Sequence, residues 1–129
     1  MSRYFLDRSL GGIKVPQTLR ASGWNIVTMH EHYGKARAQI VDDVTWITEM
    51  TGLGFTLLTS DARIVSNIIE ARAIEAAGAV VFILPKGDMT SDQMAQRFDS
   101  QRAAIDARAA GPAPAAYAVY ARTLSQVFP

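Results

Sequence analysis

The sequence predicts an α/β protein with a mainly parallel sheet, on three observations. Segments rich in β-branched and aromatic residues alternate with amphipathic segments through residue 110, as in strands joined by crossover helices. AVVFILP, at residues 79–85, is apolar without a break, as in a strand that is buried on both faces of a sheet. The chain has 129 residues, of which 49% are apolar, and we expect one domain spanning residues 1–129.

The first half of the chain is predicted to contain three strands separated by helical segments. Pro16 suits the first turn of a helix and Gly23 its end. A later helix begins with two aspartates, one of which provides an N-cap, and ends at Gly52 or Gly54. In chain order we expect a strand at 4–6, the helix ending at Gly23, a strand at 24–29, a polar loop entering a short helical piece at 30–39, a helix from Asp42 and a strand at 55–59.

The second half continues this alternation. Thr90 stands three residues before Gln93, which is the spacing of a capping box at a helix start. GPAPAA breaks that helix, and the tail after it alternates weakly in polarity, so it forms either one edge strand or a hairpin. The expected elements are a helix at 61–78 closed by Gly78, a strand at 79–85, a helix at 90–111 and the C-terminal strand or hairpin.

Composition excludes several functional classes. The chain has no cysteine, which excludes disulfides, cysteine-based zinc sites and a cysteine nucleophile. No apolar run approaches the ~20 residues that span a bilayer, and the N-terminus has no apolar signal segment, so we expect a cytoplasmic protein. The net charge is +1, so any surface that binds nucleic acid must be local. Gly11 and Gly12 are predicted to form a turn, because no phosphate-loop motif surrounds them.

Two predicted strands end in an aspartate, and this is the main functional signal. Asp7 follows the first strand and Asp61 the third, at the sheet edge where open parallel sheets bind ligands. Asp42 or Asp43, at a helix start, could reach the same place. Each aspartate also has a structural interpretation, as a helix N-cap or a turn residue. Together, three nearby carboxylates would repel one another unless a hard divalent cation such as Mg²⁺ held them.

The chain resembles the PIN-like domains of VapC-type toxins over roughly residues 3 to 120. The segments that carry the resemblance are FLDRSLGG, LRASGWNIVT, DDVTWI, LLTSDARI and AIEAAGAVVFIL, in this order and spacing. The resemblance implies a three-layer α/β/α, Rossmann-like fold and an endoribonuclease that depends on Mg²⁺ or Mn²⁺ and cleaves RNA with a metal-activated water. Such domains are usually toxins neutralised by a cognate antitoxin, and they often form homodimers.

Carried onto this chain, the resemblance assigns a role to particular residues. Its metal-binding and catalytic acids are Asp7, Asp43 (with Asp42 as the alternate) and Asp61. Thr59 or Ser60 would lie beside the metal and orient a water or a carboxylate. The fourth acid of the family departs from its usual pattern here, and Asp88 and Glu70 are its two candidates.

The remaining polar candidates have structural alternatives. Arg8 and Arg63 directly follow the two aspartate signals, so they either contact RNA phosphates or pair with those aspartates; Lys14, Lys35 and Arg37 are further candidates for RNA contact. His30 and His32 are predicted to be surface residues, because no third metal ligand accompanies them. Trp24 and Trp46, in periodic apolar segments, are predicted to be core.

Two other functions fit parts of the same pattern. A receiver-type signalling domain also has strand-end aspartates, a threonine and a lysine after a late strand, here Lys86, but it needs adjacent acids where this chain has Asp7 followed by Arg8. A PIN-like scaffold that has lost catalysis and only binds a partner is the second alternative.

Overall fold

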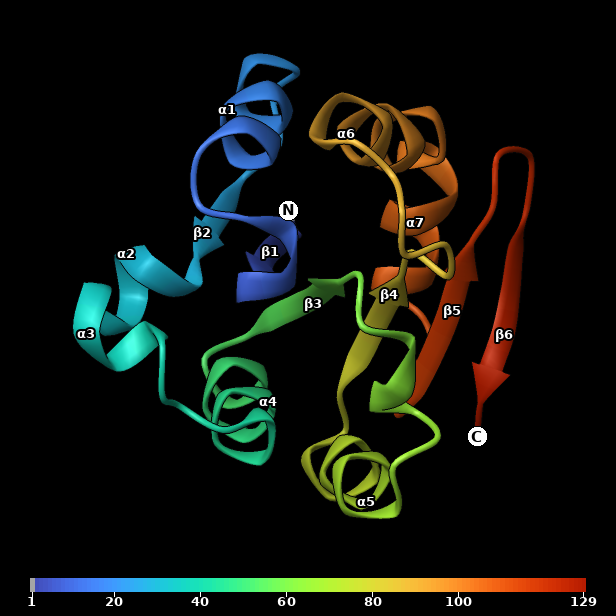
Figure 1. The fold of residues 1–129 in the computed structure, drawn as a ribbon. Coiled ribbons are helices and arrows are strands. Elements are labelled where there is room, and N and C mark those ends of the chain that lie inside the picture. The colour runs from blue at the N-terminus through green and yellow to red at the C-terminus, as the bar shows by residue number, and fades with distance from the viewer. Residues whose placement is uncertain (1) are drawn as a thin grey trace.

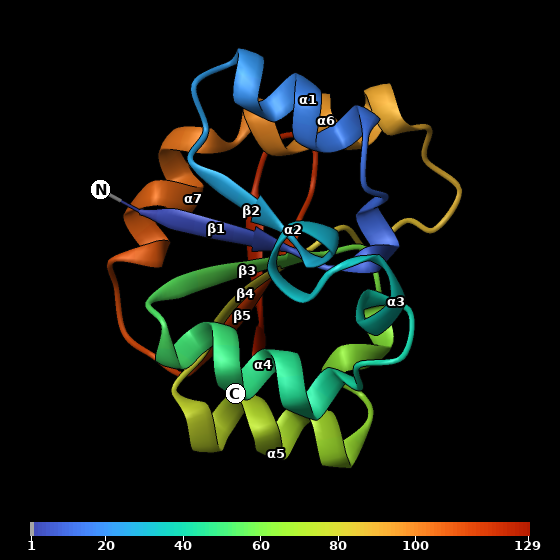
Figure 2. The ribbon, with the colours of Figure 1, turned by 90° about the vertical axis from the view of Figure 1, so that its left-hand side faces the viewer.

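A computed structural model describes residues 2–129 of the chain. Within these residues a six-stranded sheet is covered by helices on both faces (Figures 1 and 2). The strands are β1 (Arg3–Leu6), β2 (Ile26–Thr28), β3 (Phe55–Thr59), β4 (Val80–Ile83), β5 (Ala115–Val119) and β6 (Leu124–Phe128). The helices are α1 (Lys14–Ala21), α2 (Met29–Tyr33), α3 (Lys35–Ala38), α4 (Asp43–Gly52), α5 (Ile68–Ala77), α6 (Ser91–Ser100) and α7 (Arg102–Ala109), with 3-10 turns η1 (Arg8–Leu10) and η2 (Ala62–Ile64).

The sheet is mainly parallel, as the sequence predicts. Its strand order is β2-β1-β3-β4-β5-β6, and every neighbouring pair is parallel except β5 with β6. In the register of β1 and β3, Leu6 lies beside Leu58, so the residues that follow these strands leave the sheet next to each other. Strands one and three are therefore adjacent, which is the condition for their aspartates to share one site.

Alternation along the strands divides the core into two layers. Tyr4, Leu6 and Leu58 face the side that α1, α6 and α7 cover. Phe5 and Leu57 face the opposite side, under α4 and α5, and Figure 2 shows these two helical layers above and below the sheet. The predicted three-layer α/β/α architecture is confirmed. The predicted burial of both tryptophans is also confirmed: Trp24 belongs to the first layer and Trp46 to the second.

One segment differs from its prediction in kind. The sequence predicts a loop for most of residues 30–39, and a strand that reaches residue 29. The structure instead ends β2 at Thr28, which caps α2: its hydroxyl accepts from the Glu31 amide, and the Glu31 carboxylate accepts from the Thr28 amide. The capping box was overlooked because Thr28 also fits the β-branched pattern of a strand.

Two long predicted helices are interrupted. The helix expected at 61–78 consists of η2, a turn and α5, because Asn67 provides a new N-cap by accepting from the amides of Ile69 and Glu70. The helix expected at 90–111 breaks at Gln101 into α6 and α7. The predicted capping box of Thr90 and Gln93 is confirmed, and the tail is the hairpin of β5 and β6 rather than a single strand (Figure 1).

Candidate active site

The carboxyl edge of the sheet gathers most of the predicted acidic residues. Asp7 directly follows β1, and Asp43 is the first residue of α4. Asp61 is the second residue after the end of β3. Along β1, Leu6 faces the α1 side, so the next residue, Asp7, points to the side of α4 and α5. Asp7 is therefore turned toward the helices that carry Asp43 and Glu70.

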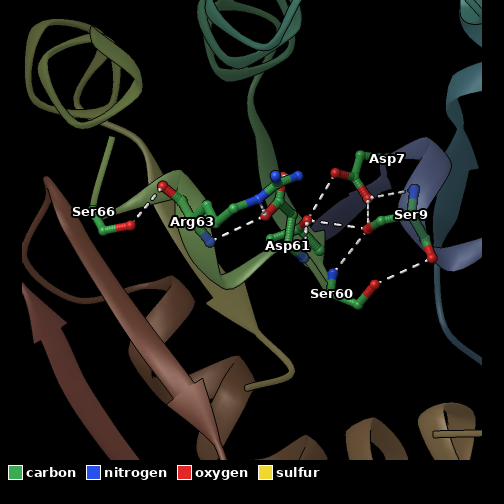
Figure 3. Close-up of polar contacts among 7 residues, drawn as sticks. Asp7, Ser9, Ser60, Asp61, Arg63 and Ser66 are labelled. Atoms are coloured by element: carbon green, nitrogen blue, oxygen red, sulfur yellow. Dashed lines mark hydrogen bonds and ion pairs between the residues drawn. The ribbon is translucent and has the colours of Figure 1, made fainter. Parts of the chain in front are cut away.

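Hydroxyl groups hold the carboxylate of Asp7 in a fixed orientation. Thr59, at the end of β3, is fully buried and donates its hydroxyl to Asp7 Oδ2 at 2.7 Å. Asp7 Oδ1 accepts from the Ser9 amide at 3.1 Å and from the Ser9 hydroxyl. The Asp61 amide donates to Thr59 Oγ1 at 3.0 Å, which leaves the hydroxyl proton directed at Asp7. Figure 3 shows this chain of contacts from Asp7 through Ser9 to Ser60.

Burial makes the charge of Asp7 unfavourable in the metal-free protein. The side chain is 5% exposed, and removal from water raises the pKa of Asp7 from 3.8 to about 6. The hydrogen bonds from Ser9 and Thr59 favour the charged form and oppose this rise, whereas the nearby charge of Asp43 adds to it. A cation at this point would remove the penalty.

The aspartate pair at the start of α4 divides its roles. Asp42 is the N-cap: its Oδ1 accepts from the Thr45 amide at 2.8 Å, and the side chain is exposed to solvent. Asp43 is half-buried and accepts from the indole nitrogen of Trp46 at 2.8 Å. The charge of Asp43 raises the pKa of both Asp7 and Glu70. Asp43 is therefore the member of the pair that faces the other acids.

Glu70, in the first turn of α5, is the fourth acidic group at this edge. The pKa of Glu70 is raised from 4.5 to about 7, mainly by burial, then by the neighbouring Asp43 and by the charge of Asp61. Its Oε2 atom is buried, and no hydrogen-bond donor reaches it within residues 2–129. Asp88 behaves differently: it is exposed in the loop after β4, and none of the polar contacts of the described chain joins it to these four acids.

Asp61 is oriented by its own turn. Its Oδ1 accepts from the Arg63 amide at 3.0 Å, which caps η2, and from the Arg63 guanidinium at 3.1 Å. The Arg63 side chain is 86% exposed, so this ion pair is weakly held. Both interpretations of Asp61 are thus compatible, because the carboxylate that caps the turn also lies close enough to Glu70 to affect its pKa.

These acids do not form a ready metal cage. Among residues 2–129, no three histidine, cysteine, aspartate or glutamate side chains are close enough together to hold a metal ion as they stand. One oxygen of the Asp43 carboxylate is engaged by Trp46, and one oxygen of Asp61 by Arg63. The acidic side chains therefore share one edge of the sheet and shift one another's pKa values, but they do not form a preformed cluster of metal ligands.

Arg8 occupies a different place from the one expected. Its guanidinium donates to the carbonyls of Ala38, at 2.8 Å, and Val41, at 2.9 Å, and also reaches Met29 Sδ at 3.4 Å. Arg8 therefore clamps the segment between α3 and α4 that ends at Asp42 and Asp43. Neither expectation for this residue, contact with RNA or pairing with Asp7, accounts for these bonds.

The other predicted polar residues are distributed around this edge. Lys14 begins α1 and is exposed, and the Arg37 guanidinium lies over the ring of Tyr33. His30 and His32 belong to α2, where His30 Nε2 lies 3.3 Å from Gln39 Nε2. Ser60 donates its hydroxyl to the Ser9 carbonyl at 3.1 Å.

Two residues that shape the site were missed in the sequence. Ser9 bonds Asp7 through both its amide and its hydroxyl, and its hydroxyl also accepts from the Ser60 amide at 2.9 Å. An aspartate followed two positions later by a serine is the signature of a small capped turn. Asn67 was missed because η2 and α5 together have the length and polarity of one helix, yet it caps the turn that carries Glu70.

Comparison with known proteins identifies the family. The family profile described as "PIN like domain" matches residues 2–86. The chain belongs to the PIN-like domain family. The resemblance found in the sequence is confirmed, and the match includes the segments that carry Asp7, Asp43, Asp61 and Glu70.

A curated relative extends the match over nearly the whole chain. The Mycobacterium tuberculosis H37Rv protein named "Putative ribonuclease VapC45" is 38% identical over 127 residues, covering 98% of this chain and 92% of the relative. No solved structure met the threshold for similarity to this chain. Within residues 2–129, none of the helices is both long enough and apolar enough to cross a membrane.

Proposed function

We propose that this PIN-like domain is an endoribonuclease that depends on Mg²⁺ or Mn²⁺. Support comes from family membership and from the 38% identical relative, whose name describes a ribonuclease. The observation that carries the proposal is the buried carboxylate of Asp7. Two hydroxyl groups bind it, and the charge of Asp43 is close enough to raise its pKa. A metal-dependent nuclease needs such an anionic centre to bind its cation.

The residues present fit a hard divalent cation. Their donor atoms are carboxylate oxygens, which Mg²⁺ and Mn²⁺ prefer. The buried Oε2 of Glu70 has no donor among the described residues, and the raised pKa values of Asp7 and Glu70 show how costly the negative charges are without a counter-charge. In our proposal Asp7, Asp43, Asp61 and Glu70 hold the metal, and Asp88 does not.

The side chains of the domain divide the work around that metal. When bound, it supplies positive charge that activates water and offsets the charge of the phosphodiester. Thr59 and Ser9 fix both oxygens of Asp7, so the carboxylate is preorganised. Arg8 holds the segment that delivers Asp43. Arg63, exposed beside Asp61, can exchange its ion pair for a substrate phosphate at little cost.

The proposal is tested by cleavage of a labelled RNA with purified protein. We expect cleavage with Mn²⁺ or Mg²⁺, none after treatment with a chelator, and recovery when metal is returned. Asp7→Asn should reduce the rate at least 100-fold with the fold intact. Equal cleavage by both proteins would show a contaminating nuclease, and an inactive wild-type protein that still binds metal would favour the non-catalytic scaffold.

The proposal includes a toxin role with a protein partner. VapC-type domains, which the sequence resembles, are usually neutralised by a cognate antitoxin, and the relative bears a VapC name. We expect expression of the wild-type chain to arrest growth of a bacterial host, and expression of Asp7→Asn to leave growth unaffected. Growth arrest by both would separate toxicity from RNA cleavage. The family profile and the ribonuclease name of the relative both disfavour the receiver-type alternative.

A further inference from the structure

An endoribonuclease must hold a polyanion beside its own carboxylates, and several arginines within residues 2–129 are already engaged by other groups of the chain. Arg8 is bonded to two carbonyls, and Arg63 is paired with Asp61. Arg20 is paired with Glu31 and Arg102 with Asp106. The net charge of +1 gives no general attraction for RNA, so a local surface must supply it.

A groove between α6 and the turn of the β5–β6 hairpin has the required chemistry. Its volume is about 320 Å³, and it is lined by Lys86, Met89, Gln93, Gln96, Arg97, Ser100 and Ala121. These residues provide two cations, two amides and a hydroxyl, with no carboxylate in the lining. Within residues 2–129 neither Lys86 nor Arg97 pairs with an acidic side chain.

The side chains leave donors available in this groove. Arg97 uses Nη1 for a long contact of 3.4 Å to the Val119 carbonyl, which anchors the guanidinium against β5. Gln93 uses its Oε1 to accept from the Thr90 amide, so its NH₂ group remains for a ligand. Two other grooves combine a cation with an acid, since Glu49 accompanies Arg37 in one and Asp106 accompanies Arg102 in the other.

The groove lies at the same edge of the sheet as the acids. The Leu84 amide donates to the Thr59 carbonyl at 2.9 Å, and Thr59 in turn bonds Asp7. Lys86 follows Leu84 by two residues, so the backbone of Lys86 is within about 7 Å of the backbone of Leu84. Figure 2 shows the β4–α6 loop at the edge where η1 and the starts of α4 and α5 also lie.

We propose that the Lys86–Arg97 groove binds an RNA phosphate flanking the scissile one. This inference rests on the proposed function. The strand would cross the carboxyl edge from the acids near β1 and β3 to the groove beyond β4. Arg97 matches a phosphate through its fork of N–H donors, and Lys86 adds a mobile charge. The groove thereby offsets the repulsion between the acids and the RNA backbone.

The test measures RNA binding and cleavage in one set of variants. Binding of a labelled single-stranded RNA is followed by fluorescence anisotropy across a salt series in the Asp7→Asn background, where the RNA stays intact. Lys86→Gln/Arg97→Gln should weaken binding about tenfold, and should lower the salt slope by roughly 0.7 for each lost phosphate contact. In the active background, KM should rise by a similar factor with kcat unchanged, and the advantage of longer over shorter RNA should disappear.

Two further variants act as controls. Arg3→Gln/Arg108→Gln removes the same charge from the opposite, amino edge of the sheet, and it should leave the slope and KM unchanged. Arg97→Lys should keep more affinity than Arg97→Gln, because it keeps the charge.

The outcomes separate this inference from the proposed function. Equal losses in the two double variants would reduce the effect to net charge and overturn the inference. Cleavage by the wild type with no change of KM in Lys86→Gln/Arg97→Gln would overturn the inference and leave the ribonuclease intact. A wild-type protein that cleaves no RNA would overturn the proposed function first.

Discussion

The buried carboxylate of Asp7 carries a large energetic cost in this fold. Asp7 is 5% exposed and its pKa is raised to about 6, although hydrogen bonds from Ser9 and Thr59 favour its charged form. Because the folded-state pKa lies above the unfolded value of 3.8, the fold binds the proton more tightly than the unfolded chain does. The metal-free protein therefore loses stability as the pH rises from about 4 to 6, and the full penalty is present at pH 7.

Asp7→Asn should stabilise the metal-free protein at neutral pH. The amide keeps an acceptor for Ser9 and removes the charge, which relieves a penalty of up to about 3 kcal/mol, at roughly 1.4 kcal/mol per pKa unit. The bond that Thr59 donates to Oδ2 is lost, at a smaller cost of about 1 kcal/mol. Urea unfolding in the presence of a chelator, at pH 7 and pH 4, measures this difference. We expect the gain at pH 7 and a much smaller one at pH 4. A variant that is less stable than the wild type at both values would contradict the proposed cost of this charge.

Arg8 provides a second test at the scale of single residues. If it positions Asp43, its replacement should lower kcat, and if it contacts RNA, its replacement should raise KM. Its bonds to the carbonyls of Ala38 and Val41 make it a positioning residue for Asp43. Arg8→Lys keeps the positive charge, but a single ammonium group cannot replace the fork that spans both carbonyls. We expect kcat to fall about tenfold with KM for RNA nearly unchanged, and stability to fall by about 1–2 kcal/mol. The opposite result, a raised KM with normal kcat, would restore the contact with RNA that the sequence suggests.

Helix caps connect the sequence to the site at the scale of elements. Asn67 caps α5 through the amides of Ile69 and Glu70, so it sets both the start of the helix and the position of an acid. Thr90 caps α6 in the same manner, away from the acids. Replacing either cap by alanine should cost about 1 kcal/mol of folding stability.

The two caps should differ in their effect on catalysis. Asn67→Ala releases the first turn of α5 and should lower RNA cleavage several-fold beyond any loss from unfolding, because Glu70 loses its fixed position. Thr90→Ala is the matched control, with a similar loss of stability and near-normal cleavage at saturating RNA, because the groove that Gln93 lines is expected to affect KM and not kcat. Thermal unfolding and single-turnover cleavage on the same preparations compare them. Similar activity in both variants would remove Glu70 from the site.

Element prediction succeeded where a signal is local and failed where two signals compete. The Thr90–Gln93 box and the closing Gly78, whose φ is +69°, were predicted correctly because both signals lie within one turn. The start of α2 at Met29 is not predicted, because Thr28 both ends β2 and caps α2, and its β-branched side chain suits either role. The pairing of β5 with β6 depends on contacts that the local sequence does not specify. The sequence therefore leaves two possibilities for the tail, a single edge strand or a hairpin.

At the scale of the whole molecule, topology brings the acids to one edge. The sequence places Asp7 and Asp61 after strands, but only the pairing of β1 with β3 makes those strands neighbours. The side-chain directions could not be predicted, since the turn of Asp61 toward Arg63 and of Asp43 toward Trp46 depends on local packing. The choice between Glu70 and Asp88 likewise required the position of α5 relative to α4.

Metal binding should stabilise the whole fold. The size of this stabilisation in variants of Glu70 and Asp88 should show which of the two acids binds the metal. A ligand that binds only the folded state at 100 times its Kd adds about 2.7 kcal/mol to the free energy of unfolding. We therefore expect Mn²⁺ to raise the thermal unfolding temperature of the wild type, and to do so less at pH 5 than at pH 7. The sign follows from the raised pKa values of Asp7, about 6, and Glu70, about 7, because the metal must displace their protons at low pH.

Glu70→Gln should greatly weaken this response at pH 7, whereas Asp88→Asn should retain it, because Asp88 lies exposed after β4 while Glu70 senses Asp43 and Asp61. Both variants replace one acidic side chain by its amide, so a loss of the response in Glu70→Gln alone reports local coordination of the cation. A response that is lost in Asp88→Asn and kept in Glu70→Gln would mean that the β4–α6 loop closes over the metal. The Lys86–Arg97 groove would then move with that loop, and the path inferred for RNA would have to be redrawn.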